Sequence, residues 1–81
     1  MYHASGRRHL SRLIKRSFSL AGHRTSVALE PEFWAALNDV AAAHGKSLTA
    51  LVAATDAGRD SGRPLASALR ILALGEVPRD R

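Results

Sequence analysis

The stretch Arg24-Thr25-Ser26-Val27-Ala28-Leu29-Glu30-Pro31 decides the predicted fold. Side chains of a strand alternate between two faces. Thr25, Val27 and Leu29 therefore share one face, and the opposite face carries Arg24, Ser26 and Ala28. A lone short strand leaves its backbone hydrogen-bonding groups unpaired, and no later segment has comparable strand character. We therefore expect the strand to pair with the same strand of a second chain, forming an antiparallel two-stranded ribbon.

The size of the chain favours the same conclusion. It has 81 residues and no cysteine, and its four histidines lack metal-ligand spacing with a nearby carboxylate. A small domain without disulfides or a metal commonly gains stability by burying surface between subunits. We expect a homodimer, or a higher oligomer built from it, with no metal and no cofactor.

Composition and motifs disfavour membrane proteins and enzymes. No apolar run approaches the roughly 20 residues that span a bilayer, and no secretory signal pattern opens the chain. We therefore expect a cytoplasmic protein without a membrane partner. No serine stands in a nucleophile-elbow pattern and no glycine-rich nucleotide loop occurs, so no catalytic residue is predicted.

Positive charge is concentrated at the N-terminus. The net charge is +5, and residues 1–24 hold six of the twelve Lys and Arg residues and no acidic residue. A basic arm that neutralises phosphates releases counterions and so favours binding to nucleic acid; a solvated tail without function is the alternative. The spacing of Leu10, Leu13 and Ile14 predicts a short cationic helix within residues 7–20, although Ser17 to Leu20 alternate as in a strand.

Three helices are predicted after the strand at about residues 24–29. Pro31 and Gly45 bound a helix at about 31–44, Ser47 caps one at about 47–57, and Pro64 opens one at about 64–75 after a turn-rich break. We expect residues 1–16 to be a mobile arm, 17–75 a folded domain and 76–81 a frayed end. The expected dimer core comprises Val27, Leu29, Phe33, Trp34, Leu37, Val40, Leu51, Val52, Leu69 and Leu72. Stacking of Trp34 on a base is an alternative to its place in the core.

Several segments resemble the ribbon-helix-helix superfamily of bacterial repressors, of the Arc and methionine-repressor type. The general pattern is the strand, Pro31, and the turn and cap at Gly45-Lys46-Ser47-Leu48. A closer similarity, to a small stand-alone bacterial subfamily, covers about residues 15–75; it rests on Lys15-Arg16-Ser17, Ala21-Gly22-His23-Arg24-Thr25-Ser26, Leu29-Glu30-Pro31-Glu32-Phe33-Trp34 and Leu65-Ala66-Ser67-Ala68-Leu69-Arg70. The resemblance implies a mainly α fold with one short strand: an intertwined homodimer with an intermolecular ribbon, plus an extra C-terminal helix.

The resemblance also implies a DNA-binding transcriptional regulator, expected to act as a repressor on double-stranded DNA. A two-stranded ribbon fits the major groove, and the base-reading positions carry over to Arg24, Ser26 and Ala28. The residues implied or expected to bind phosphates are Lys46, Ser47, Leu48 and Thr49, with Lys15 and Arg16 of the arm. The alternative is an antitoxin, or another protein-interaction module that uses the same dimer. Only about six residues follow the last predicted helix, which disfavours a tail that wraps a partner toxin.

Overall fold

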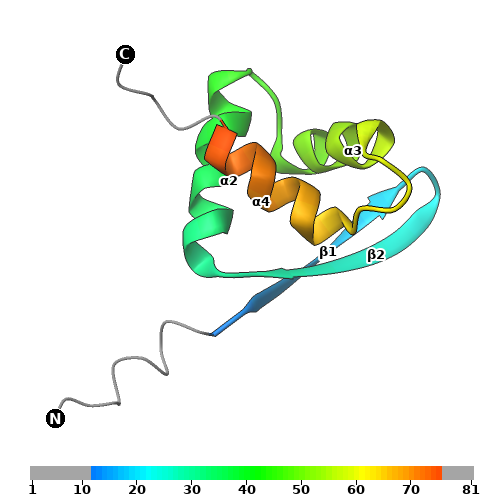
Figure 1. Cartoon of the computed structure of the whole chain (residues 1–81). Helices are drawn as coiled ribbons and strands as arrows, with labels where there is room; N and C mark the ends of the chain where they lie inside the picture. The colour runs from blue at the N-terminus through cyan, green and yellow to red at the C-terminus, as the bar shows by residue number, and fades with distance from the viewer. Residues whose placement is uncertain (1–11, 76–81) are drawn as a thin grey trace, which may run out of the picture.

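The computed structural model describes residues 12–75, which form two strands and three helices. The elements in order are β1 (Ile14–Leu20), β2 (His23–Leu29), α2 (Pro31–Ala43), α3 (Leu48–Gly58) and α4 (Leu65–Gly75). The three helices lie on one side of the two strands, and each helix contacts the other two (Figure 1). The predicted mobile arm before residue 12 and the predicted frayed end at 76–81 lie outside the described residues.

The two strands form an antiparallel hairpin within one chain. The register runs from Ile14 opposite Leu29 to Leu20 opposite His23, so only Ala21 and Gly22 form the turn. Both turn residues have positive φ, 51° at Ala21 and 84° at Gly22. Positive φ at both central positions is typical of the tight turn whose twist matches that of the flanking strands. Glycine adopts this conformation freely, whereas alanine does so at a cost.

The hairpin bears on three predictions from the sequence. The strand at 24–29 pairs along one edge with β1 of its own chain, so the sheet has two strands per chain; pairing of its other edge with a second copy stays a prediction. The sequence predicted no partner strand after residue 29, and the partner within the chain precedes the strand. Because β1 begins at Ile14, residues 14–16 belong to the folded domain and not to the arm. The predicted cationic helix is wrong for residues 12–16, the strand-like alternation of residues 17–20 is confirmed, and residues 7–11 lie outside the described residues.

The core lies between the inner face of the hairpin and the helices. β1 contributes Phe18 and Leu20, and the predicted core residues that are buried are Val27, Leu29, Trp34, Leu37, Val40, Leu51, Val52 and Leu69. Phe33 and Leu72, also predicted, are partly buried and pack against this cluster. These residues pack together within a single chain, and α4 packs on α2, α3 and β2 to complete this core; their place in a dimer stays a prediction.

Local signals set the helix ends, which lie within one residue of the expected ranges. At the end of α2 the amide of Lys46 donates to the carbonyl of Ala41 and that of Gly45 to Ala42, with Gly45 at φ 69°. This is the hydrogen-bond pattern of a glycine-terminated helix. At the start of α3 the Ser47 Oγ accepts a hydrogen bond of 3.0 Å from the amide of Ala50. The cap satisfies one of the free amides that every helix start carries.

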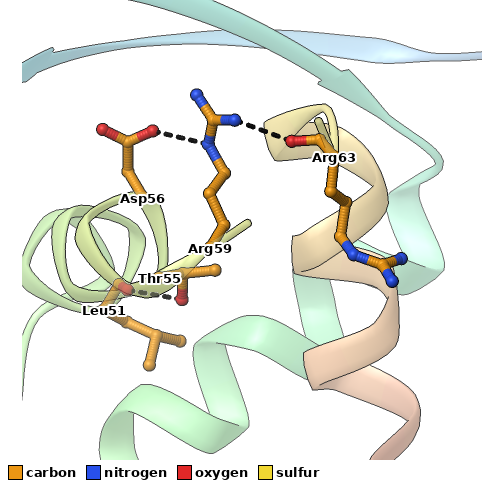
Figure 2. A network of polar contacts seen from close by, with 5 residues as sticks. All are labelled: Leu51, Thr55, Asp56, Arg59 and Arg63. Atoms are coloured by element: carbon orange, nitrogen blue, oxygen red, sulfur yellow. Dashed lines mark hydrogen bonds and ion pairs between the residues drawn. The ribbon is translucent and has the colours of Figure 1, made fainter. Parts of the chain in front are cut away.

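Arginine side chains hold the remaining connections. Arg59 donates to Asp56 Oδ1 at 2.9 Å and to the carbonyl of Arg63 at 2.7 Å, which braces the loop between α3 and α4 (Figure 2). Arg70 of α4 donates twice to Glu30 Oε1, at 3.1 and 2.9 Å, and thereby ties α4 to the junction of β2 and α2. A hydrogen bond from its own backbone amide, followed by those from Arg70, lowers the pKa of Glu30.

Candidate nucleic-acid interface

The hairpin presents one polar face away from the helices. The strand register places Lys15 opposite Ala28, Ser17 opposite Ser26, and Ser19 opposite Arg24 on this face, which we call the reading face. Five of these six side chains are exposed, and that of Ala28 is half-buried. The Oγ atoms of Ser17 and Ser26 lie 3.3 Å apart, within hydrogen-bonding distance across the strands. The inner face of the hairpin packs on the helices, so the reading face remains open (Figure 1).

The chemistry of the reading face suits a polyanion with hydrogen-bonding edges. Its six side chains provide two cations, three hydroxyl groups and one methyl group, and they include no carboxylate. Arginine and lysine can donate to O6 and N7 of guanine, a hydroxyl can donate or accept, and a methyl group can contact that of thymine. A two-stranded ribbon also has dimensions that the major groove, about 12 Å wide, admits.

The structure places the three predicted base-reading residues together on this face. Arg24, Ser26 and Ala28 point outward, while Val27 and Leu29, which alternate with them, are buried in the core. The alternation read from the sequence therefore gives the correct orientation of β2. Whether these residues contact bases stays a prediction.

Lys15 and Arg16, the two residues of the arm predicted to bind phosphates, lie on opposite faces of β1. Lys15 lies on the reading face, directly across from Ala28. Arg16 points to the other face, where its guanidinium carbon lies 5.3 Å from the centroid of the Trp34 ring. Arg16 therefore belongs to the packing of the hairpin end rather than to the reading face.

Trp34 is a core residue that also holds the first strand. Its side chain is 2% exposed, and its ring lies 5.9 Å from that of Phe18. Its Nε1–H donates a 2.8 Å hydrogen bond to the carbonyl of Ile14. A ring buried in this way is not available to stack on a base, so the core assignment is confirmed and the base-stacking alternative is wrong.

The predicted phosphate clamp lies at the start of α3, in the helical layer. The side chains of Lys46 and Thr49 are exposed there, whereas Leu48 is half-buried against the core. The Ser47 hydroxyl already accepts from Ala50, and its exposed position leaves a donor proton for another group. Because α3 packs on the inner side of β1, the clamp and the reading face occupy different surfaces of one chain.

The sequence interpretation missed two outward residues of β1, Ser17 and Ser19. Both alternate with the buried Phe18 and Leu20, and the signal for them was present in the alternation of residues 17–20 followed by the Ala21-Gly22 break. The strand-like alternation of this segment was an alternative to the predicted helix, and its pairing with residues 24–29 was not predicted.

Residues 12–75 contain neither a metal-binding cluster nor a membrane-spanning helix. In this part of the chain no three His, Cys, Asp or Glu side chains converge in a way that would hold a metal ion. None of the three described helices is long and apolar enough to cross a membrane.

The hairpin and the three helices agree with the comparisons with known proteins. Residues 13–77 match the model of the ribbon-helix-helix domain family. The chain belongs to this family. The chain is also similar to the solved structure of an uncharacterized protein from Bordetella pertussis Tohama I, with 30% sequence identity and a TM-score of 0.67. The similarity covers 83% of this chain and 57% of that one. No curated protein matches this ribbon-helix-helix chain significantly.

Proposed function

We propose that this chain is a DNA-binding transcriptional regulator, a bacterial cytoplasmic repressor whose reading face enters the major groove. The single observation that carries the proposal is a polar, cationic ribbon face that none of the three helices described within residues 12–75 covers. Membership of the ribbon-helix-helix family supports it, because these domains are generally DNA-binding regulators or antitoxins. The proposed partners are double-stranded DNA and a second copy of the chain.

Base recognition in this proposal comes from the side chains of the ribbon. The Arg24 guanidinium can donate both of its parallel N–H groups to one guanine, a geometry that other bases do not offer. Ser26 lies beside Ser17, and its hydroxyl can donate a hydrogen bond to a base edge or accept one from it. Ala28 can contribute only a methyl contact, so the guanine contact supplies the larger share of the discrimination.

Phosphate contacts in this proposal set the position of the protein. The exposed Lys46 and Thr49 flank a helix start whose first amides point out of the helix, and both features favour a phosphate. Such contacts raise the affinity for every sequence alike and make it depend on salt. They are expected to serve the same duplex that the ribbon reads, in an assembly of two chains.

The test measures fluorescence anisotropy of labelled duplexes from the region upstream of the protein's own gene, with scrambled duplexes for comparison, at low and physiological salt. Arg24→Ala is expected to reduce the preference for the native duplex by roughly 1 to 3 kcal/mol. The matched control is Arg63→Ala, which removes the same charge from an exposed arginine in the loop before α4. An equal loss on native and scrambled duplexes would contradict the reading role of Arg24.

The second candidate is a protein-interaction module, such as an antitoxin. It is favoured by Ile71 and Leu74 of α4, which are 51% and 62% exposed, since large exposed apolar side chains in a group mark contact sites. Ile71 also lines a groove of about 370 Å³ between α3 and α4. Affinity purification from the native host, followed by mass spectrometry of bound small proteins, tests it. A stoichiometric partner lost in Ile71→Glu, together with no DNA binding, would favour this candidate.

A further inference from the structure

We propose that β1 forms the outer strand of a four-stranded sheet in the DNA-bound dimer, where Lys15 and Ser19 bind phosphates at the rims of the major groove. The inference rests on the proposed DNA-binding function and on the expected pairing of β2 with its copy, and it deepens both. It divides the reading face into an inner half on β2, which reads bases, and an outer half on β1, which sets the position of the protein.

The first step is the position of β1 at one edge of β2. Within residues 12–75 the sheet has two strands in the order β1-β2, and the antiparallel register includes all seven residues of β1. The hairpin therefore leaves one edge of β2 for a second chain. Two copies joined along that edge by a two-fold axis perpendicular to the sheet give the strand order β1-β2-β2-β1, with both reading faces on the same side.

The second step compares the width of this sheet with that of the groove. Neighbouring strands lie about 4.8 Å apart, so the two copies of β2 fit side by side in a groove about 12 Å wide. The two copies of β1 are three spacings apart, which is about 14 Å. They cannot follow the inner pair to the base edges, and they lie level with the sugar-phosphate walls on either side. Side chains that point outward from β1 therefore meet phosphates first.

The outward side chains of β1 suit phosphates. Lys15 and Ser19 are exposed and stand at the two ends of the outward row of β1, with Ser17 between them. An ammonium and a hydroxyl both donate hydrogen bonds to phosphate oxygens. Neither strand contains an aspartate or a glutamate, so no carboxylate of the hairpin repels the DNA backbone. Four residues at about 3.4 Å each separate Lys15 from Ser19, so the two side chains reach different phosphates.

Ser17 differs from its two outward neighbours because it contacts the inner strand. Its Oγ lies 3.3 Å from that of Ser26, and a hydrogen bond between the two hydroxyl groups uses the proton of one of them. When Ser17 donates, the proton of Ser26 is left for a base edge, and the base-reading strand keeps its donor. The phosphate contacts of β1 therefore come from Lys15 and Ser19.

Lys15 stands on anchored backbone. The carbonyl of Ile14 accepts the 2.8 Å hydrogen bond from Trp34, and the guanidinium of Arg16 lies over the Trp34 ring. These contacts hold the residues on either side of Lys15 against the core, so its Cα keeps a fixed position in the sheet. A phosphate contact from a fixed position sets the register of the protein on the duplex, whereas a flexible tail supplies charge alone.

The experiment measures fluorescence anisotropy of the full-length protein with native and scrambled duplexes between about 50 mM and about 200 mM salt. Each lysine that neutralises a phosphate contributes about 0.9 to the slope of log affinity against log salt concentration, and a dimer carries two copies of Lys15. Lys15→Ala should therefore lower the slope by about 1.8, so the rise in salt weakens the variant about 12-fold less than the wild type. The loss of affinity should be equal on native and scrambled duplexes.

Three further variants serve as comparisons. Lys15→Arg should keep the slope of the wild type, because arginine carries the same charge. Ser19→Ala should weaken binding to all duplexes by roughly 2- to 10-fold for each contact, with an unchanged slope, because the lost donor is neutral. Arg63→Ala removes a charge from an exposed residue in the loop before α4 and should leave the slope unchanged.

Neutral methylphosphonate linkages, introduced one at a time into the native duplex, locate the contacts. Each linkage should weaken wild-type binding where the protein holds that phosphate. Two symmetric positions that flank the bases read by Arg24 should lose this effect in Lys15→Ala, which identifies them as the partners of Lys15.

The outcomes separate this inference from the proposed function. A Lys15→Ala variant with the slope of the wild type, or with a lost preference for the native duplex, would overturn the inference and leave base reading by β2 intact. Methylphosphonate effects that are identical in Lys15→Ala and the wild type would overturn the phosphate assignment. A wild-type protein without preference for the native duplex would contradict base reading, and the slope would still decide the role of Lys15. A wild-type protein that binds no duplex would overturn both.

Discussion

Replacement of Trp34 by phenylalanine should loosen the open end of the hairpin and leave the helical core assembled. The change removes the Nε1–H that donates at 2.8 Å to the Ile14 carbonyl, a bond worth roughly 0.5 to 1.5 kcal/mol net. It also removes part of a buried ring, about 40 Å² of apolar area or about 1 kcal/mol. The contact of Arg16 with the ring weakens by a few tenths of a kcal/mol more, at roughly the scale of an exposed cation–π pair. We expect a total loss of about 2 kcal/mol in the free energy of unfolding.

Urea unfolding measures the global loss, and amide hydrogen exchange locates it. Trp34→Phe should speed exchange at the open end of the hairpin, near Ile14 and Leu29, more than in α2 and α3. The control is Phe18→Leu, which removes the ring beside Trp34 but keeps the indole hydrogen bond. It should destabilise the protein without favouring exchange at the open end. A loss below about 0.5 kcal/mol in Trp34→Phe, with unchanged local exchange, would show that the indole does not anchor β1.

Three further substitutions test local features of the fold. Ala21→Asn should raise the free energy of unfolding by roughly 0.5 to 1 kcal/mol, and with it the melting temperature, because Asn adopts φ near 51° at less cost than Ala. A lower melting temperature would refute the turn assignment. Glu30 has its pKa lowered below 4.5 in the folded state, chiefly by its own backbone amide and then by Arg70. The ionised Glu30 therefore stabilises the fold above pH 4.5, and this stabilisation is lost as the pH falls through the folded-state pKa. Glu30→Gln should make the melting temperature depend less on pH between about pH 6 and about pH 3. Identical profiles for the variant and the wild type would argue against this role of Glu30. Ser47→Ala should cost roughly 0.5 to 2 kcal/mol in urea unfolding by removing the cap on Ala50, whereas Ser47→Asp should retain most of the stability.

The sequence predicted the half of the reading face that β2 contributes, but not the half that β1 contributes. The alternation of residues 24–29 identified Arg24, Ser26 and Ala28 as one side of a strand, and the structure places them so. Lys15 and Arg16 were predicted as equivalent members of a basic arm. They lie on opposite faces of β1, because neighbouring residues of a strand point in opposite directions and residues 14–16 belong to the strand. The error followed from the missing strand boundary, not from the chemistry of the side chains.

The sequence by itself determined the features that depend on neighbours in the chain. Pro31, Gly45 and Ser47 act on backbone groups within a few residues, and period-two or helical spacing marks the buried side of each element. The three helices and the inward face of β2 follow from these local rules.

Only the tertiary structure decided which strand pairs with β2 and in which register. Backbone hydrogen-bonding groups are alike at every residue, so a strand accepts any partner whose inward face fits the core. Here β1 supplies that face through Phe18 and Leu20, and the indole of Trp34, 20 residues along the chain, holds its first residue. The partner is fixed by packing of β1 against helices distant in sequence, and this packing places Lys15 beside Ala28 on the reading face.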